Sequence, residues 1–598
     1  MNKVINKVLI LLCLTLLIIP ANAQFENAKK VKIEAVAVTS GENPTGVVIN
    51  ITVIVTPGNG KVFVSTSPFT EIDMQGSAQL AALTACDLLG IDFTSYDFFY
   101  IIEADSPIVG GPSAGAVMTI ATIAALKDLE LRHDVFMTGM IYPDGFIGPV
   151  GGLTYKLDAA AKSGGKIFLI PKGQRITYVE EKKIKRLGIV NVVTTEVKKV
   201  DLVEYGKERG VDVYEVETIN DALKFYANYE IKIPSGNFSI VEYSELLKKL
   251  ALKMEESLNE IKGLASSKKA DQLIEDGKKY YDEGMYYTAT SRYFEAKIYL
   301  RYALYKSTIT SPQKFDAEVG KILDEINAMK VYLKHEKLGV NTFQLFAAAQ
   351  ERIGEAEQSI EKAKNAKSDE DALYYLAYAK ERVESAKLWL SLLPEIKNDY
   401  ELNENEVEKR AEFYITQAGS MLVYASSLSG ASELLSQAYE SFALAKNLFE
   451  SGFYAGASVL AVDAITQASL SIELKYGGDV EDKIKSAENS AKVAISEAEK
   501  TLTPVLPVAY YEFAKTSDNK FVKLMYFKLS ERLAKLLNFI AFSGTERELI
   551  RTEFIPPTIT TIERSKISEI ISTPGFEVGA AIFAIAYAVY RTSIRKSR

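Results

Sequence analysis

Apolar residues follow two different patterns along the chain. In residues 31–38 and 47–55, β-branched residues partly alternate with polar ones, which predicts a pair of strands. Apolar residues at helical spacing predict helices over 77–89, 113–126 and 153–163, and a short apolar run predicts a buried strand over 166–170. Interleaved helices and strands of this kind indicate an α+β domain over residues 24–229.

Residues 242–543 are rich in Ala, Leu, Lys, Glu and Tyr and poor in Pro and Gly, with apolar residues at helical spacing. They predict an all-α array of helical hairpins. Two segments, which begin at Gly284 and Gly452, resemble the turn and second helix of a tetratricopeptide-type hairpin, although no regular repeat of 34 residues runs through the region. Turn-forming residues mark a linker over 230–241.

The N-terminus has the order of a secretory signal peptide. Lys3 and Lys7 precede an apolar run over residues 8–19, and Ala21 and Ala23 follow it. A cationic start, an apolar stretch and an Ala-x-Ala site predict cleavage after residue 23, so that residues 1–23 are a signal peptide.

The C-terminus has a second apolar run over residues 578–590, within a segment 574–598 that ends in several cations. The run is a marginal membrane span, and the cations favour the cytoplasmic side. The segment also resembles the sorting tails of archaeal surface proteins. We therefore expect residues 574–598 to be a membrane anchor or sorting tail and residues 544–573 to be a stalk, with the body of the protein outside the cytoplasmic membrane, at the cell surface.

Composition narrows the chemistry that the chain can perform. The 78 acidic and 70 basic side chains give a formal charge of −8, so no nucleic-acid partner is expected. The chain has two cysteines, Cys13 and Cys86, and two histidines, His133 and His335, too few for a zinc site with several cysteines or a His-rich metal centre. No metal or cofactor is expected, and any catalysis would rest on hydroxyl, amine or carboxylate groups.

The sequence Val-Gly-Gly-Pro-Ser-Ala-Gly over residues 109–115 opens an apolar helix and gives the strongest local signal. Ser113 has the position of a nucleophile, because the free N–H groups of a first helical turn can stabilise an oxyanion. The motif also fits the nucleophile elbow of α/β-hydrolases, which needs an acid and then a later histidine. His133 lies only 20 residues downstream and His335 lies in the helical array, so that alternative fails. The glycines alone would fit a tight turn into the helix.

A second motif changes this interpretation. Thr138-Gly139 is followed by Gly-Pro-Val-Gly-Gly-Leu-Thr-Tyr-Lys over residues 148–156, and Ile-Pro-Lys follows over 170–172. At this point the chain resembles the proteolytic domain of Lon-type proteases, which use a Ser-Lys dyad. The resemblance spans about 200 residues and includes the 43-residue step from Ser113 to Lys156. Among such proteins it is most similar to archaeal membrane-anchored Lon-like serine proteases that lack an ATPase domain.

The resemblance implies a role for each matching residue. It makes Ser113 the nucleophile and Lys156 the general base, with Gly111, Ala114, Thr138 and Gly139 in support. It also implies polypeptide substrates and assembly into a homo-oligomeric ring. An amine serves as a base only if burial lowers its pKa, and Lys156 lies on an apolar helix that suits such burial.

The chain also departs from the family pattern. Gly110 and Met140 stand where the family usually has acidic residues, which leaves the substrate preference and any switching between inactive and active states open. The sequence Gly-x-x-x-x-Gly-Lys-Ser/Thr of a nucleotide-binding loop does not occur, so no ATPase domain is expected.

Two functions remain open at this stage. The first is a secreted, membrane-tethered, ATP-independent serine endopeptidase that hydrolyses unfolded or flexible polypeptides. The alternative is a catalytically inactive surface scaffold that binds partner proteins through its helical repeats. In either case the helical region is a candidate site for a protein partner, and the C-terminal tail for contact with the membrane.

Overall fold

The computed structural model describes residues 28–39, 44–70, 72–109, 111–187, 190–232, 238–239, 243–475, 479–551 and 554–557. The expected signal peptide, residues 1–23, and the expected C-terminal anchor, residues 574–598, lie outside the described residues. Gly110 and residues 233–237 of the expected linker lie outside them as well.

The N-terminal domain is built on a four-stranded sheet with the strand order β1-β2-β4-β3. Its strands are β1 (Lys29–Val38), β2 (Gly46–Pro57), β3 (Val62–Thr70) and β4 (Tyr96–Val109). The predicted strand pair is confirmed, because β1 and β2 are antiparallel with Ile33 opposite Ile51. Strand β4 runs antiparallel to β2 and parallel to β3. The buried side chains of this sheet face the helices of the domain.

A second sheet, with the order β11-β8-β5, is entirely parallel. It consists of β5 (Val135–Met137), β8 (Ile167–Pro171) and β11 (Asp212–Val216), so the strand predicted over 166–170 is confirmed. A small antiparallel hairpin, β6 (Met140–Ile141) and β7 (Ile147–Gly148), follows β5. The helices are α2 (Ile72–Leu89), α3 (Gly115–Lys127), α4 (Leu153–Lys162), α5 (Leu202–Lys207) and α6 (Ile219–Ala227), with 3-10 turns η2 (Phe93–Ser95) and η3 (Pro112–Ala114).

Helix α3 is the central helix of the domain. Every residue from Gly115 to Leu126 is buried, because the helix is apolar on all sides and packs against α2, α6 and the first sheet. The N-terminal end of this helix is therefore held in a rigid environment.

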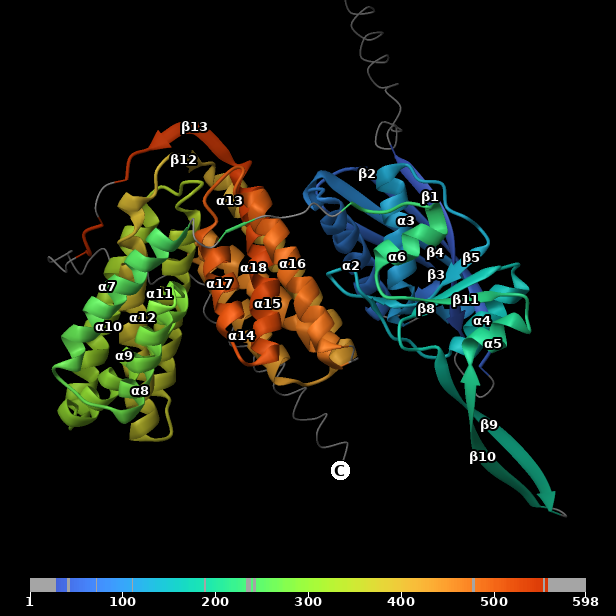
Figure 1. The fold of residues 1–598 in the computed structure, drawn as a ribbon, viewed down its shortest axis with the longest axis horizontal. Coiled ribbons are helices and arrows are strands. Elements are labelled where there is room, and N and C mark those ends of the chain that lie inside the picture. Colours follow the sequence, from blue (N-terminus) through green and yellow to red (C-terminus); the bar gives the residue numbers. More distant parts are fainter. Residues whose placement is uncertain are drawn as a thin grey trace, which may run out of the picture.

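A long antiparallel hairpin, β9 (Ile176–Leu187) and β10 (Val190–Asp201), projects from the N-terminal domain (Figure 1). Among the described strands, the two pair only with each other. Strands of 12 residues extend about 40 Å at the usual rise per residue. The sequence analysis did not predict this arm.

The C-terminal region is helical, as predicted. Many of its helices begin after a Ser, Asn or Asp side chain that accepts a backbone N–H, which stabilises the first turn. The helices are α7 (Ser244–Lys262), α8 (Lys268–Asp282), α9 (Tyr286–Thr308), α10 (Pro312–His335), α11 (Phe343–Lys364), α12 (Asp369–Leu390), α13 (Glu404–Ser429), α14 (Glu433–Glu450), α15 (Tyr454–Lys475), α16 (Val480–Ala498), α17 (Val505–Thr516) and α18 (Lys520–Ala541).

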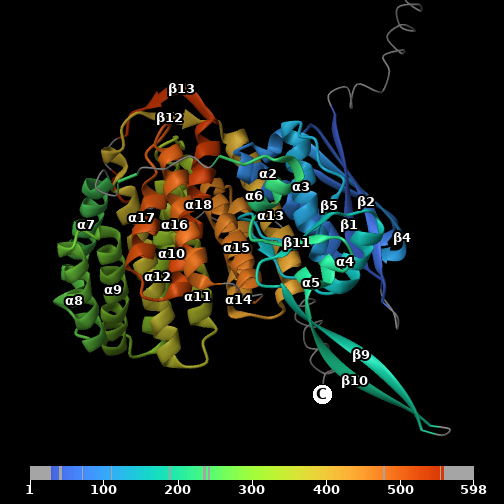
Figure 2. The same ribbon diagram turned by 45° about the vertical axis from the view of Figure 1, so that its right-hand side comes forward.

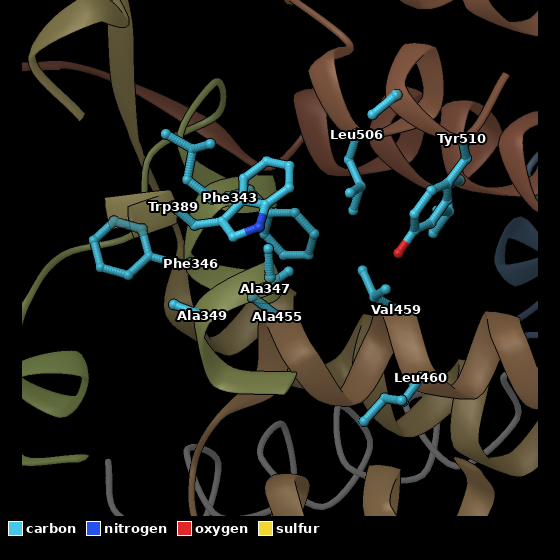
Figure 3. Packing of buried hydrophobic residues seen from close by; sticks show 14 of the residues in the cluster. Phe343, Phe346, Ala347, Ala349, Trp389, Ala455, Val459, Leu460, Leu506 and Tyr510 are labelled. Atoms are coloured by element: carbon cyan, nitrogen blue, oxygen red, sulfur yellow. The ribbon is translucent and has the colours of Figure 1, made fainter. Parts of the chain in front are cut away.

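One apolar core runs through most of this helical region. Figure 3 shows Phe343 of α11, Trp389 of α12, Val459 of α15 and Leu506 of α17 in this core. The two segments singled out in the sequence are the α8–α9 and α14–α15 turns, where Gly284 and Gly452 have φ of +78° and +80°, backbone angles that favour glycine.

Helix α15 is the one helix among the described residues that is long and apolar enough to span a membrane. Within its most apolar 18-residue window, 89% of the residues are buried inside the protein. The helix packs against α11, α13, α14 and α18, so it is the central helix of this part of the core.

Residues 544–551, the first part of the expected stalk, are folded against the helical region. Strand β13 (Gly544–Leu549) pairs with β12 (Asp399–Leu402), and Arg551 forms an ion pair with Asp399 at 2.9 Å. Asp399 is only 1% exposed and needs a buried partner, which fixes the chain on the helical region through residue 551. Phe554 then packs against Tyr332.

The helical region packs directly on the N-terminal domain. Helix α13 lies along α2 (Figure 2), and Met421 and Tyr424 belong to the same buried cluster as residues of the first sheet. A Cβ atom at Gly76 of α2 would lie 2.6 Å from Tyr424 Cδ2, so glycine permits this close contact. The two regions, which the sequence presents as separate bodies, therefore share one buried apolar cluster, in addition to the core of the helical region itself.

Candidate active site

Ser113 lies in a tight turn between a strand and the central helix. Strand β4 leads to Gly111, which has a φ of +91°, a conformation that L residues rarely adopt. The 3-10 turn η3 contains Ser113 and runs directly into α3. Ser113 is partly exposed, whereas Ala114 is buried. The turn thus brings a serine hydroxyl to the N-terminal end of a buried helix.

A second backbone segment lies against this turn. The Gly139 N–H donates to the Ser113 carbonyl oxygen at 2.9 Å, and the Ala116 N–H donates to the Gly139 carbonyl oxygen at 3.1 Å. A Cβ atom at Gly139 would lie 2.3 Å from Ile147 Cγ2, so no larger residue fits unless Ile147 of the β6–β7 hairpin shifts. Glycine at this position allows the two segments to approach each other closely.

Lys156 reaches the site from α4. The helix begins after Gly152, whose φ is +69°, and buries its apolar face against β1 and β2. A Cβ atom at Gly46 of β2 would lie 1.8 Å from the Tyr155 carbonyl oxygen, so this contact requires glycine as well. Lys156 itself is 4% exposed, although an isolated lysine is ordinarily solvated.

Hydrogen bonds connect the lysine to the serine turn through Thr138. Lys156 Nζ donates to Thr138 Oγ1 at 3.1 Å, and Thr138 Oγ1 donates to the Ser113 carbonyl oxygen at 3.4 Å. In this arrangement the partner of the amine is the threonine hydroxyl and not Ser113 Oγ. Thr138 therefore orients the amine beside the serine turn.

Burial lowers the pKa of Lys156 to about 8. Within the described part of the chain, no carboxylate forms an ion pair with Lys156 that would hold its proton. A lysine with the ordinary pKa of 10.5 is almost entirely protonated at pH 7, whereas this one is neutral in about a tenth of the molecules. The amine can accept a proton at neutral pH.

The sequence-predicted residues meet at this one place. Ser113, Thr138, Gly139 and Lys156 are joined by the hydrogen bonds described above, and Gly111 and Ala114 flank the serine. The sequence analysis did not assign a role to Gly115, where a Cβ atom would lie 2.7 Å from Ile141 Cγ2. Its position as the last glycine of Gly-Pro-Ser-Ala-Gly is the signal that could have indicated this close contact.

A cavity of about 120 Å³ lies elsewhere, between α2 of the N-terminal domain and α13, α15 and α18. Apolar side chains such as Leu83, Phe413 and Met421 line most of it. Neither Ser113 nor Lys156 lines this cavity, so it does not belong to the candidate active site.

Comparison with known proteins identifies the part of the chain that contains this site. Residues 20–203 match the model of the Lon protease (S16) C-terminal proteolytic domain. This part of the chain is a Lon-type protease domain. The residues matched include the Ser113 turn, Thr138 and the helix that carries Lys156.

Individual Lon proteases match stretches of similar length in this chain. Lon protease 1 of Myxococcus xanthus is 35% identical over 155 residues, which are 25% of this chain and 19% of the relative. The archaeal Lon proteases of Pyrococcus abyssi and Thermococcus kodakarensis are 32% identical over 171 residues and 28% identical over 190 residues. These matches cover 28% and 31% of this chain and 17% and 29% of the relatives. The chain thus matches less than a third of the length of each of these relatives. The similarity supports a serine protease role for this domain.

Proposed function

We propose that the protein is a serine endopeptidase in which Ser113 is the nucleophile and Lys156 the general base. One observation carries the proposal: Lys156 is buried, has no carboxylate partner among the described residues and is joined through Thr138 to the Ser113 turn. A structural lysine in a core would instead be paired with an acid, because an unpaired buried charge is costly. An inactive scaffold gives no reason to keep this arrangement.

In the proposed reaction, the neutral amine of Lys156 accepts the proton of the Ser113 hydroxyl as Oγ attacks the carbonyl carbon of a peptide bond. The Lys156 ammonium then donates that proton to the leaving amine, and an acyl-enzyme remains. A water molecule gives a proton to Lys156 as its oxygen attacks the ester carbon, and Lys156 then returns that proton to Ser113 Oγ as the C–Oγ bond breaks, which releases the carboxylic acid product and restores the serine. Backbone N–H groups at the start of the helix are suited to stabilise the oxyanion.

The proposed substrates are unfolded or flexible polypeptides that are cleaved without ATP. The sequence has no nucleotide-binding loop of the Gly-x-x-x-x-Gly-Lys-Ser/Thr type, so the chain itself has no evident means of unfolding a stable protein. The terminal signals support a location outside the cytoplasmic membrane, with residues 574–598 as the anchor. Removal of residues 574–598 should then release an active form from the membrane.

The test is to compare the wild type with Ser113→Ala in hydrolysis of an unfolded protein such as casein and in labelling by a fluorophosphonate probe. The variant should lose both signals and keep its circular dichroism spectrum. Ser163→Ala is the matched control, because Ser163 is an exposed residue at the end of α4 and should behave as wild type. Hydrolysis by Ser113→Ala at the wild-type rate would exclude the proposed nucleophile, and a folded wild type without either signal would favour the scaffold.

A further inference from the structure

We propose that Lys528, in the helical region, is a positioning residue for the protease site and acts through the β6–β7 hairpin, which it binds at Asp144. This inference rests on the proposed function, since it names the role of the helical region in that reaction. The two residues are 384 positions apart in the sequence, and their ion pair joins α18 to the turn of the hairpin.

The β6–β7 hairpin is a direct continuation of the candidate site. Strand β6 begins at Met140, immediately after Thr138 and Gly139, and pairs with Gly148 of β7. Because Gly139 is hydrogen-bonded to the Ser113 carbonyl oxygen and to the Ala116 N–H, a shift of the hairpin would move Thr138 and the Ser113 turn together. The position of this hairpin thus sets the position of Thr138, whose hydroxyl orients the Lys156 amine.

The turn of the hairpin presents Asp144 to the helical region. Pro143, Asp144 and Gly145 form the turn, in which Gly145 has a φ of +81°. Asp144 Oδ1 accepts the Phe146 N–H at 3.3 Å, which fixes the carboxylate, and Asp144 Oδ2 accepts a hydrogen bond from Lys528 Nζ.

A buried group of charges surrounds this contact. Lys528 Nζ also donates to Glu473 Oε1 of α15 at 3.0 Å. Lys483 Nζ of α16 donates to the Glu473 carbonyl oxygen at 3.1 Å and lies 5.8 Å from the centre of the Tyr142 ring in the hairpin. The side chains of Lys528 and Glu473 are 4% and 1% exposed. Three helices of the helical region therefore meet at the hairpin turn.

The ammonium of Lys528 offsets the negative charges of the Asp144 and Glu473 carboxylates. Burial alone would raise the pKa of Asp144, but the charge and hydrogen bond of Lys528, together with the Phe146 N–H and the charge of Arg532, hold that pKa below the usual range. Burial would lower the pKa of Lys528, but Asp144 and Glu473 raise it to about 12. Without the ammonium, the Asp144 and Glu473 carboxylates would face each other with Lys483 and Arg532 as the remaining cations, and repulsion between the carboxylates would push Asp144 and its turn away.

Another ion pair between the same two regions provides a matched control. Lys535, also on α18, binds Asp87 of α2 at 2.8 Å and Glu531 of its own helix at 2.9 Å. It joins the two regions as Lys528 does, but its partner lies on α2 and not on the hairpin. A residue that merely attaches the helical region to the protease domain should behave like Lys535.

The experiment compares Lys528→Met, Lys528→Arg and Lys535→Met in the full chain. For Ser113-dependent peptide hydrolysis, Lys528→Met should lower kcat by about tenfold with KM within about twofold, within the range of coupling through packed elements. Lys528→Arg should recover part of the loss, and Lys535→Met should stay near wild type. An equal kcat for Lys528→Met and wild type, or equal losses for both methionine variants, would overturn the proposal.

Amide hydrogen exchange separates this proposal from the proposed function. In Lys528→Met, the amides of residues 139–148 should exchange about tenfold faster than in Lys535→Met. If the wild type has no Ser113-dependent activity, the proposed function fails. If residues 139–148 exchange at the same rate in Lys528→Met as in Lys535→Met, the positioning role fails. If Lys528→Met does not fold, Asp144→Asn tests the same contact from the hairpin and should give the same loss of kcat and the same faster exchange.

Discussion

Replacement of the buried Lys156 by methionine should abolish hydrolysis and, at the same time, stabilise the folded protein at neutral pH. Methionine has a similar length and no charge, so it fills the same space without the cost of burying an amine. Lys156 binds a proton more weakly in the folded protein than in the unfolded chain, because its pKa falls from 10.5 to about 8 on folding. Protonation therefore favours unfolding.

The size of the effect follows from the two pKa values. Above pH 10.5 the amine is neutral in both states and costs nothing, and the cost grows as the pH falls and is complete below pH 8. It amounts to about 3 kcal/mol at pH 7 and about 1.4 kcal/mol at pH 9.5. Methionine also loses the hydrogen bond to Thr138, worth about 1 kcal/mol. The net gain is thus about 2 kcal/mol at pH 7 and nearly zero at pH 9.5.

Differential scanning calorimetry at the two pH values can measure this gain. For a domain of roughly 200 residues, 2 kcal/mol corresponds to a rise of about 4–8 °C in Tm at pH 7. Lys162→Met is the control, because Lys162 is exposed in the last turn of α4 and should give no pH-dependent gain. A Tm for Lys156→Met at or below that of wild type at pH 7 would refute the reasoning, as would a gain that does not shrink at pH 9.5.

Three further substitutions or reagents probe the same domain. Thr138→Val should lower kcat and move the acidic limb of the pH–rate profile to lower pH, because the protonated form of Lys156 loses a hydrogen-bond acceptor and the pKa of the amine falls. An unchanged profile would show that the hydroxyl does not contact the amine. Gly139→Ala should reduce both activity and Tm, by about 1–3 kcal/mol in stability, since the new Cβ meets Ile147 Cγ2. Cys86 should resist alkylation by iodoacetamide until the protein is unfolded, because its side chain is 2% exposed and burial raises its pKa. Rapid labelling of the native protein would contradict that burial.

The candidate site could be predicted from the sequence because its signals are local. Ser113 lies in a glycine-rich helix start, and Lys156 lies on an apolar helix whose spacing from the serine matches a known pattern. The burial of Lys156 could be expected from its neighbours on that helix, but its hydrogen bond to Thr138 depends on how α4 packs against the sheet. No pattern along the chain reports such a contact.

The contact between the two regions could not be predicted for a different reason. From the sequence, Asp144 and Lys528 would each be expected to be ordinary solvated charges, since most Asp and Lys residues are exposed. The Pro-Asp-Gly turn around Asp144 is a clear local signal for a hairpin, but it does not reveal what the carboxylate binds. Similarly, Arg551 follows the predicted helices, and only the fold brings it to the buried Asp399.

The packing of α13 on α2 has a consequence for how the protein is made. Gln79 of α2 donates to Gln417 of α13 at 2.9 Å, and 338 residues separate them in the chain. At about 5–20 residues per second, a ribosome needs roughly 20–70 s to add those residues. During that interval the face of α2 that Met421 and Tyr424 later cover is exposed to water. The N-terminal domain thus reaches its final form only after most of the helical region has been synthesised, and a chain that stops before α13 would leave an apolar helix uncovered.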